Sequence, residues 1–184
     1  MALTTVSAGL RDRFFEEWLA CTIGTYPEQT RRLLREDRDS FRNPVGHTLG
    51  VSLRGLTEEL CGGFDRARVT AWLDAVVRLR AVQDFSSADA VGFVALAQDA
   101  AHRVFENGSL GLSPGALDVL GARIEDMAAI AADLFNRCRE EIHAIGARAA
   151  RRRVFVLERA QARVAARAAA RACAPQSAPR GELL

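Results

Sequence analysis

Hydrophobic side chains recur at three- and four-residue steps along most of the chain, which is the spacing of one face of an α-helix. The first such stretch covers about residues 7–25, and its apolar positions are Leu10, Phe14, Trp18 and Cys21. Pro27 suits the first turn of a second, shorter helix that ends among charged residues near position 39. The only β-branched and aromatic run, residues 154–157, lies among helix-favouring alanine and arginine. The pattern therefore predicts an all-α protein.

Polar capping residues mark where three further helices begin. A side-chain oxygen at such a position accepts a hydrogen bond from the first free backbone N–H groups of a helix. The expected caps are Asn43, Asp65 and Ser86, and the helices that they open span about 43–62, 65–83 and 86–107. Gly62 and Asn107 with Gly108 supply the stop signals for the first and last of these helices.

The last helix is expected to be much longer than the others. It opens at Ser113 and Pro114, and no proline follows before Pro175. Its first part carries apolar residues in a heptad-like seam, namely Leu117, Leu120, Ile124, Met127, Ala131, Leu134 and Cys138. The sequence thus predicts a bundle of about six helices with a long C-terminal helix, and we interpret the seam as a contact with a partner or a second copy.

Charge divides the chain into two parts. Residues 1–146 hold 16 Arg and 21 acidic residues, a net charge of −5, whereas residues 147–184 have a net charge of +7. We therefore expect a helical domain over 7–146, an Arg/Ala-rich helical extension over 147–173 and a disordered tail over 174–184. The arginines on one side of the extension are Arg148, Arg152, Arg159, Arg163, Arg167 and Arg171. They fit a solvated helix, a helix paired in a homodimer, or a surface for nucleic acid or anionic membrane.

The signatures of catalysis and metal binding are missing from the sequence. It has no phosphate-binding glycine loop and no GxSxG motif, and its three histidines fall on separate expected helices. The four cysteines are far apart, as expected of reduced thiols. We expect no enzyme activity, no catalytic residues, no metal and no cofactor. Without a leader or a long apolar stretch, a cytoplasmic location is expected.

Two segments carry more polar groups than packing requires, residues 40–49 and residues 78–93. The candidates for a ligand or signal pocket are Asn43, His47, Arg80, Gln83 and Asp84. Three of them also have a structural interpretation: Asn43 as a cap, His47 as a histidine in the interior or at its edge, and Arg80 in a buried polar network. Asp84 is one possible partner for Arg80. A haem-sensing role for His47 remains an alternative.

The same segments resemble the N-terminal domain of the RsbRD family, the RsbT co-antagonists of bacterial stress signalling. The resemblance rests on FRNPVGHTL, RLRAVQDFSSADAVGFV and LFNRCREEI, and it spans about residues 10–145. It is strongest to short stand-alone members whose genes often lie beside those of the Dsr membrane redox complex. The resemblance implies a helical sensory domain related to non-haem globins, but it implies no ligand residues.

In longer members of that family the last helix leads into an output module such as a STAS domain, and the residues after Arg153 here resemble none. We therefore expect a stand-alone regulatory and sensory domain that acts through contacts with a protein partner, as a homodimer. Binding of nucleic acid or an anionic membrane by the basic extension is the first alternative. A haem or metal sensor is the second.

Overall fold

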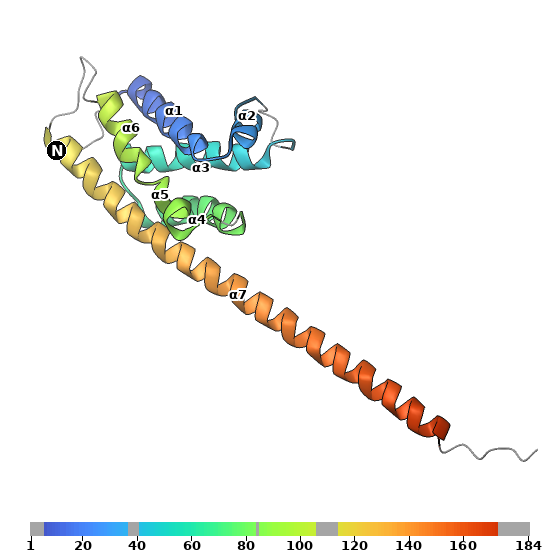
Figure 1. The fold of residues 1–184 in the computed structure, drawn as a ribbon. Helices are drawn as coiled ribbons and strands as arrows, with labels where there is room; N and C mark the ends of the chain where they lie inside the picture. The colour runs from blue at the N-terminus through green and yellow to red at the C-terminus, as the bar shows by residue number, and fades with distance from the viewer. Residues whose placement is uncertain (1–5, 37–40, 84, 106–113, 173–184) are drawn as a thin grey trace, which may run out of the picture. The chain divides into compact units, whose positions relative to one another are not determined.

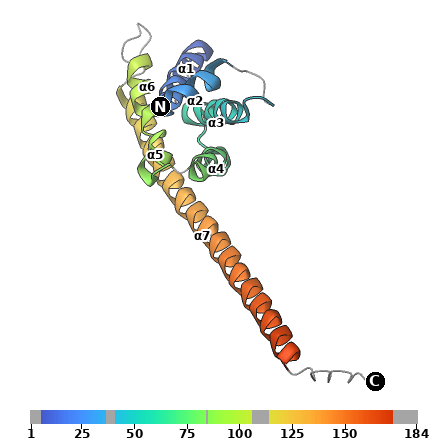
Figure 2. The ribbon, with the colours of Figure 1, turned by 45° about the vertical axis from the view of Figure 1, so that its right-hand side comes forward.

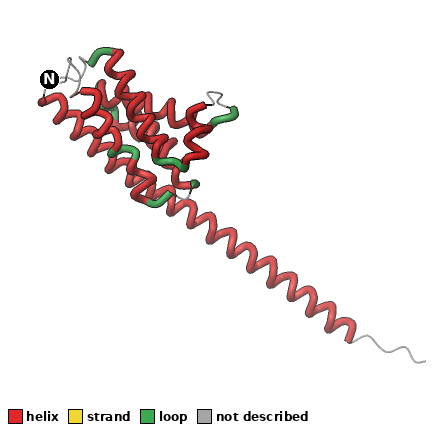
Figure 3. The backbone as a smooth tube through the Cα atoms, turned by 45° about the horizontal axis from the view of Figure 1, so that its top comes forward, coloured by secondary structure: helices red, strands yellow, loops and turns green. Residues whose placement is uncertain are grey.

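A computed structural model describes residues 6–36, 41–83, 85–105 and 114–172. Every regular element in these ranges is a helix (Figure 3), which confirms the all-α prediction. The helices are α1 (Ala8–Gly24), α2 (Glu28–Glu36), α3 (Pro44–Cys61), α4 (Arg66–Val82), α5 (Ser87–Gly92), α6 (Leu96–Phe105) and α7 (Pro114–Ala172). Contacts within the chain define two units, residues 1–140 and 141–184, and α7 contributes to both.

Four helices begin at polar caps. The side chain of Ser7 accepts a hydrogen bond from Leu10 N at the start of α1, and Asp65 accepts from Ala67 N and Arg68 N at the start of α4. The caps of α3 and α5 are Asn43 and Ser86. Three of the four were predicted as caps from the sequence, at Asn43, Asp65 and Ser86, whereas the predicted cap Ser113 lies outside the described residues.

The helix expected over 86–107 is two helices, because the backbone turns at Phe93. The amide of Ala97 bonds to Val94 O at 3.0 Å, which leaves Phe93 O outside the regular helical ladder. That carbonyl accepts a hydrogen bond of 2.7 Å from the buried indole Nε1 of Trp18. A tertiary hydrogen bond thus satisfies the backbone group that the break would otherwise leave unpaired in the core.

In the first unit, α3 packs against α1 and α4, and α1 packs against α6 (Figure 1). Aromatic rings fill the space between α1 and the segment 93–105: Phe14 stacks near Trp18, Trp18 near Phe93, and Phe14 meets Phe105. All four side chains have at most 1% of their surface exposed. These four rings form the apolar centre of the first unit, although aromatic residues make up only 7% of the chain.

The first part of α7 belongs to this core and lies beside α6 (Figure 2). The seam expected to meet a partner is buried inside the unit: this holds for Leu120, Ile124, Met127 and Leu134, with Leu117 half-buried. The prediction of these residues as a dimer surface is wrong, since their apolar side chains already cover the bundle. Arg123 adds a polar tie, donating to Leu60 O at 2.6 Å and Gly62 O at 2.9 Å at the carboxyl end of α3.

The second unit contains α7 from residue 141 onward. Its described side chains are exposed except for Ile142, which is half-buried. The exposed apolar side chains are Ile145, Val154, Phe155, Val156, Leu157 and Val164. The helical extension was expected over these residues, whereas the tail over 174–184 lies outside the described residues.

Close packing of α3 on α4 depends on Gly55. A Cβ atom there would lie 2.4 Å from Trp72 Cε2, whereas a Cβ at Gly50 on the same helix would meet no atom within 4 Å. We expect Gly55→Ala to lower the free energy of unfolding by about 1–3 kcal/mol through overpacking. Gly50→Ala should instead raise it by about 0.5–1 kcal/mol, because alanine favours a helix more than glycine does. Urea unfolding of both variants measures the difference, and equal effects would contradict the close contact.

Candidate functional site

Asn43 joins the end of α2 to the start of α3. Its side-chain oxygen accepts a hydrogen bond of 2.8 Å from Gly46 N, while its Nδ2 donates to Leu34 O at 3.2 Å and Leu33 O at 3.3 Å. One amide therefore satisfies a free N–H of α3 and two carbonyls at the end of α2. This double use explains why Asn43 is buried, and only an amide side chain can both donate and accept in this way.

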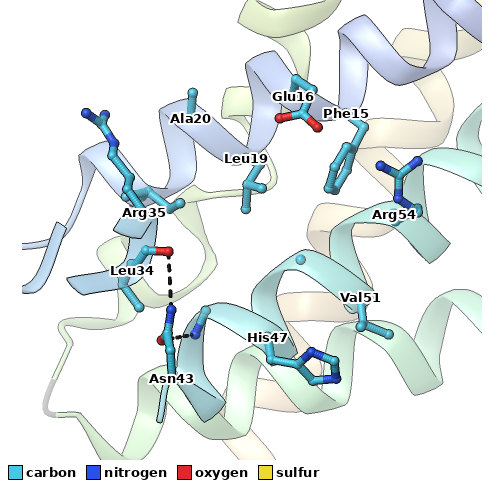
Figure 4. Close-up of a pocket in the computed structure, with 13 residues that line it drawn as sticks. Phe15, Glu16, Leu19, Ala20, Leu34, Arg35, Asn43, His47, Val51 and Arg54 are labelled. Carbon is cyan, nitrogen blue, oxygen red and sulfur yellow. Dashed lines mark hydrogen bonds between the residues drawn. The ribbon is translucent and has the colours of Figure 1, made fainter. Parts of the chain in front are cut away.

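A groove of about 510 Å³ lies between α1 and α3, with α2 at one end (Figure 4). Helical spacing places its α3 residues on one side of that helix, from Asn43 through Gly46, His47 and Gly50 to Arg54. Phe15, Leu19 and Ile23 line it from α1 at four-residue steps. Its other lining residues are Glu16, Ala20, Leu34, Arg35 and Val51. The size of the groove suits a small ligand.

The second polar cluster surrounds Arg80 of α4, whose exposed fraction is 0%. Its guanidinium donates to Asp89 O at 2.8 Å, to Thr25 Oγ1 at 2.9 Å and to Thr22 O at 3.4 Å. In the part of the chain that the structure describes, none of its hydrogen bonds goes to a carboxylate. Burial accordingly lowers the pKa of Arg80 below its ordinary value. The cluster ties α4 to the end of α1 and the start of α5.

Aromatic rings enclose the same guanidinium. Its central carbon lies 4.9 Å from the centre of the Phe85 ring, 5.1 Å from that of Phe93 and 5.2 Å from that of Tyr26. Such cation–π contacts partly replace the hydration that the cation loses. A second cavity, of about 490 Å³, lies beside this cluster and is lined by Thr25, Tyr26, Pro27, Thr30, Gln83, Phe85, Ser86 and Asp89.

A known protein family matches the first unit and the start of the extension. Residues 12–153 match the family described as the RsbT co-antagonist protein rsbRD N-terminal domain. The chain belongs to this family. The RsbRD N-terminal domain is a regulatory, sensory domain of stress signalling, and all three segments that carried the resemblance lie inside the match. No curated protein and no solved structure matches the chain.

The four described residues of the five predicted for one pocket do not meet in this RsbRD domain. Asn43 and His47 line the groove, whereas Gln83 lines the second cavity, and the two share no lining residue. Asn43 and Arg80 are buried, but His47 and Gln83 are exposed, and Asp84 lies outside the described residues. Arg80 has carbonyl and hydroxyl partners at the end of α1 and the start of α5, as its interpretation in a buried polar network requires.

Several residues of these two sites were not found from the sequence. Thr25 and Tyr26 contact Arg80 from the end of α1, more than fifty positions away in the chain, and no local pattern marks them. Arg54 could have been found, since it lies on the same side of α3 as Asn43 and His47. Nothing in the sequence distinguishes Arg123 from the other arginines of the chain. Its role is apparent only in the fold, where the end of α3 lies beside it.

The remaining candidates for chemistry are dispersed. His47, His102 and His143 are exposed on three different helices, and the described residues contain no group of three potential metal ligands. Among the described cysteines, Cys61 and Cys138 are buried and Cys21 is half-buried, all as free thiols. Burial raises the pKa of Cys61 to about 11, so its thiol is protonated and unreactive at neutral pH. None of the described helices has an apolar stretch long enough to cross a membrane.

The Arg80 cluster should contribute strongly to stability. Arg80→Met removes the donors to two backbone carbonyls and a hydroxyl, and unpaired buried acceptors should lower the free energy of unfolding by about 2–4 kcal/mol. Arg78→Met is the matched control on the same helix, because Arg78 is half-exposed and pairs with Asp74, and it should change stability by less than about 1 kcal/mol. Urea unfolding measures both, and equal small losses would show that the cluster does not hold α4 in place.

Proposed function

We propose that the chain is a cytoplasmic signalling domain that senses a condition through its first unit and acts by binding a protein partner, with no catalysis of its own. Its membership in the RsbRD N-terminal domain family supports the sensory role. The dispersed histidines and the engagement of Arg80 in a structural cluster are consistent with a binding function. The partner surface that we propose lies on α7 in the second unit.

The observation that carries this proposal is an uncovered apolar stripe on the extension. Val154, Leu157 and Val164 are each 54–68% exposed. With 3.6 residues per turn they fall on one side of α7, with Gln161 between Leu157 and Val164, while Arg148, Arg152, Arg159 and Arg163 fall on the opposite side. Exposed apolar side chains that follow one another along a helix are typical of a helix that packs on another protein surface. A second copy of the chain is the first partner that we propose.

A double change tests the stripe in the full chain. In Val154→Glu with Leu157→Glu, a contact would have to bury two carboxylates, so we expect dimers in sedimentation velocity experiments to become monomers. In a pull-down from a host lysate, the same variant, when immobilised, should no longer retain the proteins that the immobilised wild-type chain retains. Ala166→Glu is the matched control, because it places a carboxylate on the arginine side of the same helix.

Two results would contradict the proposal. A double variant that keeps both its sedimentation coefficient and its retained proteins would exclude the stripe as the contact. Equal losses in Ala166→Glu would show that added negative charge, and not the apolar stripe, decides binding. The wild-type chain could also be a monomer whose binding of host proteins is lost in the double variant. That result would show that the stripe binds a different protein and not a second copy of the chain.

The arginine side of α7 favours a second candidate function, binding of nucleic acid or an anionic membrane. Residues 147–184 carry a net charge of +7, and the described arginines of this segment are exposed as far as Arg167. Polyanion binding by such a surface weakens as salt rises, because bound counterions are released. Salt-sensitive binding to duplex DNA or to phosphatidylglycerol vesicles, unaffected by the Val154 and Leu157 changes, would favour this function over the first.

A further inference from the structure

The groove between α1 and α3 has an apolar floor and a basic rim. Phe15, Ile23 and Leu34 contribute to the floor and are themselves almost fully buried. Arg35 and Arg54 lie at opposite ends, with His47 at the rim, and among the described residues that line the groove Glu16 is the one acid (Figure 4). A ligand that matches this surface has an apolar body and a negative charge.

The room in the groove comes from the α3 side. Gly46 and Gly50 stand there one helical turn apart and present no side chain toward α1. A Cβ at Gly50 would meet no atom within 4 Å, so the space beside it is open, whereas a Cβ at Gly46 would lie 2.2 Å from Asn43 Nδ2. The groove can therefore be filled at position 50 without disturbing the cap of α3.

Arg54 is the cation best placed to hold a negative group. Its guanidinium carbon lies over the Phe15 ring, 4.1 Å from the ring centre, so the cation is at the edge of the apolar floor. One of its nitrogens bonds to Asp12 at 2.9 Å. A guanidinium has five N–H donors, so this bond leaves others for a second carboxylate. Both side chains are about half-exposed, so a ligand can reach them.

We propose that this groove binds a small amphiphilic carboxylate, with its hydrocarbon part over Leu19, Ile23 and Leu34 and its carboxylate on Arg54. The inference rests on the proposed sensory function only in treating this ligand as the signal. Binding itself depends on the groove alone and needs no partner protein. A result on the ligand and a result on the stripe of α7 are therefore independent of each other.

Calorimetric titration of the full chain with decanoate, and with decanol as the uncharged analogue, tests the proposal. We expect decanoate to bind more tightly than decanol. Arg54→Gln should weaken decanoate about tenfold or more and leave decanol unchanged, because it removes a charge-assisted hydrogen bond. Asp12→Asn should have the opposite sign and tighten decanoate binding, since it frees Arg54 from a competing carboxylate.

Gly50→Leu fills the groove and should abolish binding of both compounds. Gly146→Leu is the matched control, since it makes the same change within a helix, at a position where a Cβ also meets no atom within 4 Å. Circular dichroism and thermal unfolding establish that each variant is folded. Absence of decanoate binding by the wild-type chain, or unchanged binding by a folded Gly50→Leu variant, would overturn the site. Equal binding of decanoate and decanol, insensitive to Arg54→Gln, would overturn the carboxylate.

Discussion

The arrangement of the first unit depends on a single buried cation. Arg80 has no exposed surface, and its guanidinium bonds to the end of α1 and to the start of α5 while three aromatic rings surround it. Removing a cation from water is costly, and the hydrogen bonds and ring contacts of these partners together offset that cost. Phe93 belongs to the same set twice, because its ring faces Arg80 and its carbonyl accepts the hydrogen bond of Trp18. The polar cluster and the aromatic core are therefore parts of one cooperative structure.

The groove lies on the side of α1 that faces away from the aromatic core. Trp18 and Phe14 point toward α6 and the core, whereas Phe15 and Leu19 turn toward α3, so α1 separates the aromatic core from the groove. The Asn43 amide fixes the end of α2 against the start of α3 and so determines where the groove closes. Its walls come from three helices that the polar caps and the core already hold, as expected of a binding site that is largely formed before a ligand arrives.

Most of the fold could be predicted from the sequence, because helical spacing and capping residues are local signals. Asn43, Asp65 and Ser86 act as the caps that their neighbours indicated. The break at Phe93 could not be predicted, since the group that stabilises it is an indole 75 positions away. The seam on α7 was seen correctly as apolar but assigned to the wrong partner, because periodicity shows that a face is buried and not what buries it. The residues predicted for one pocket lie in two separate places, because local patterns mark polar residues near the core but do not show which of them the fold brings together.

The contact between positions 43 and 46 has a consequence for the evolution of these domains. A side chain larger than hydrogen at Gly46 would collide with the Asn43 amide, which is itself held by carbonyls of α2. Gly46 therefore cannot be exchanged freely while Asn43 is retained. In an alignment of related sequences the two positions should covary: a glycine at the second wherever asparagine occupies the first, and larger residues there only where a shorter cap such as serine replaces it.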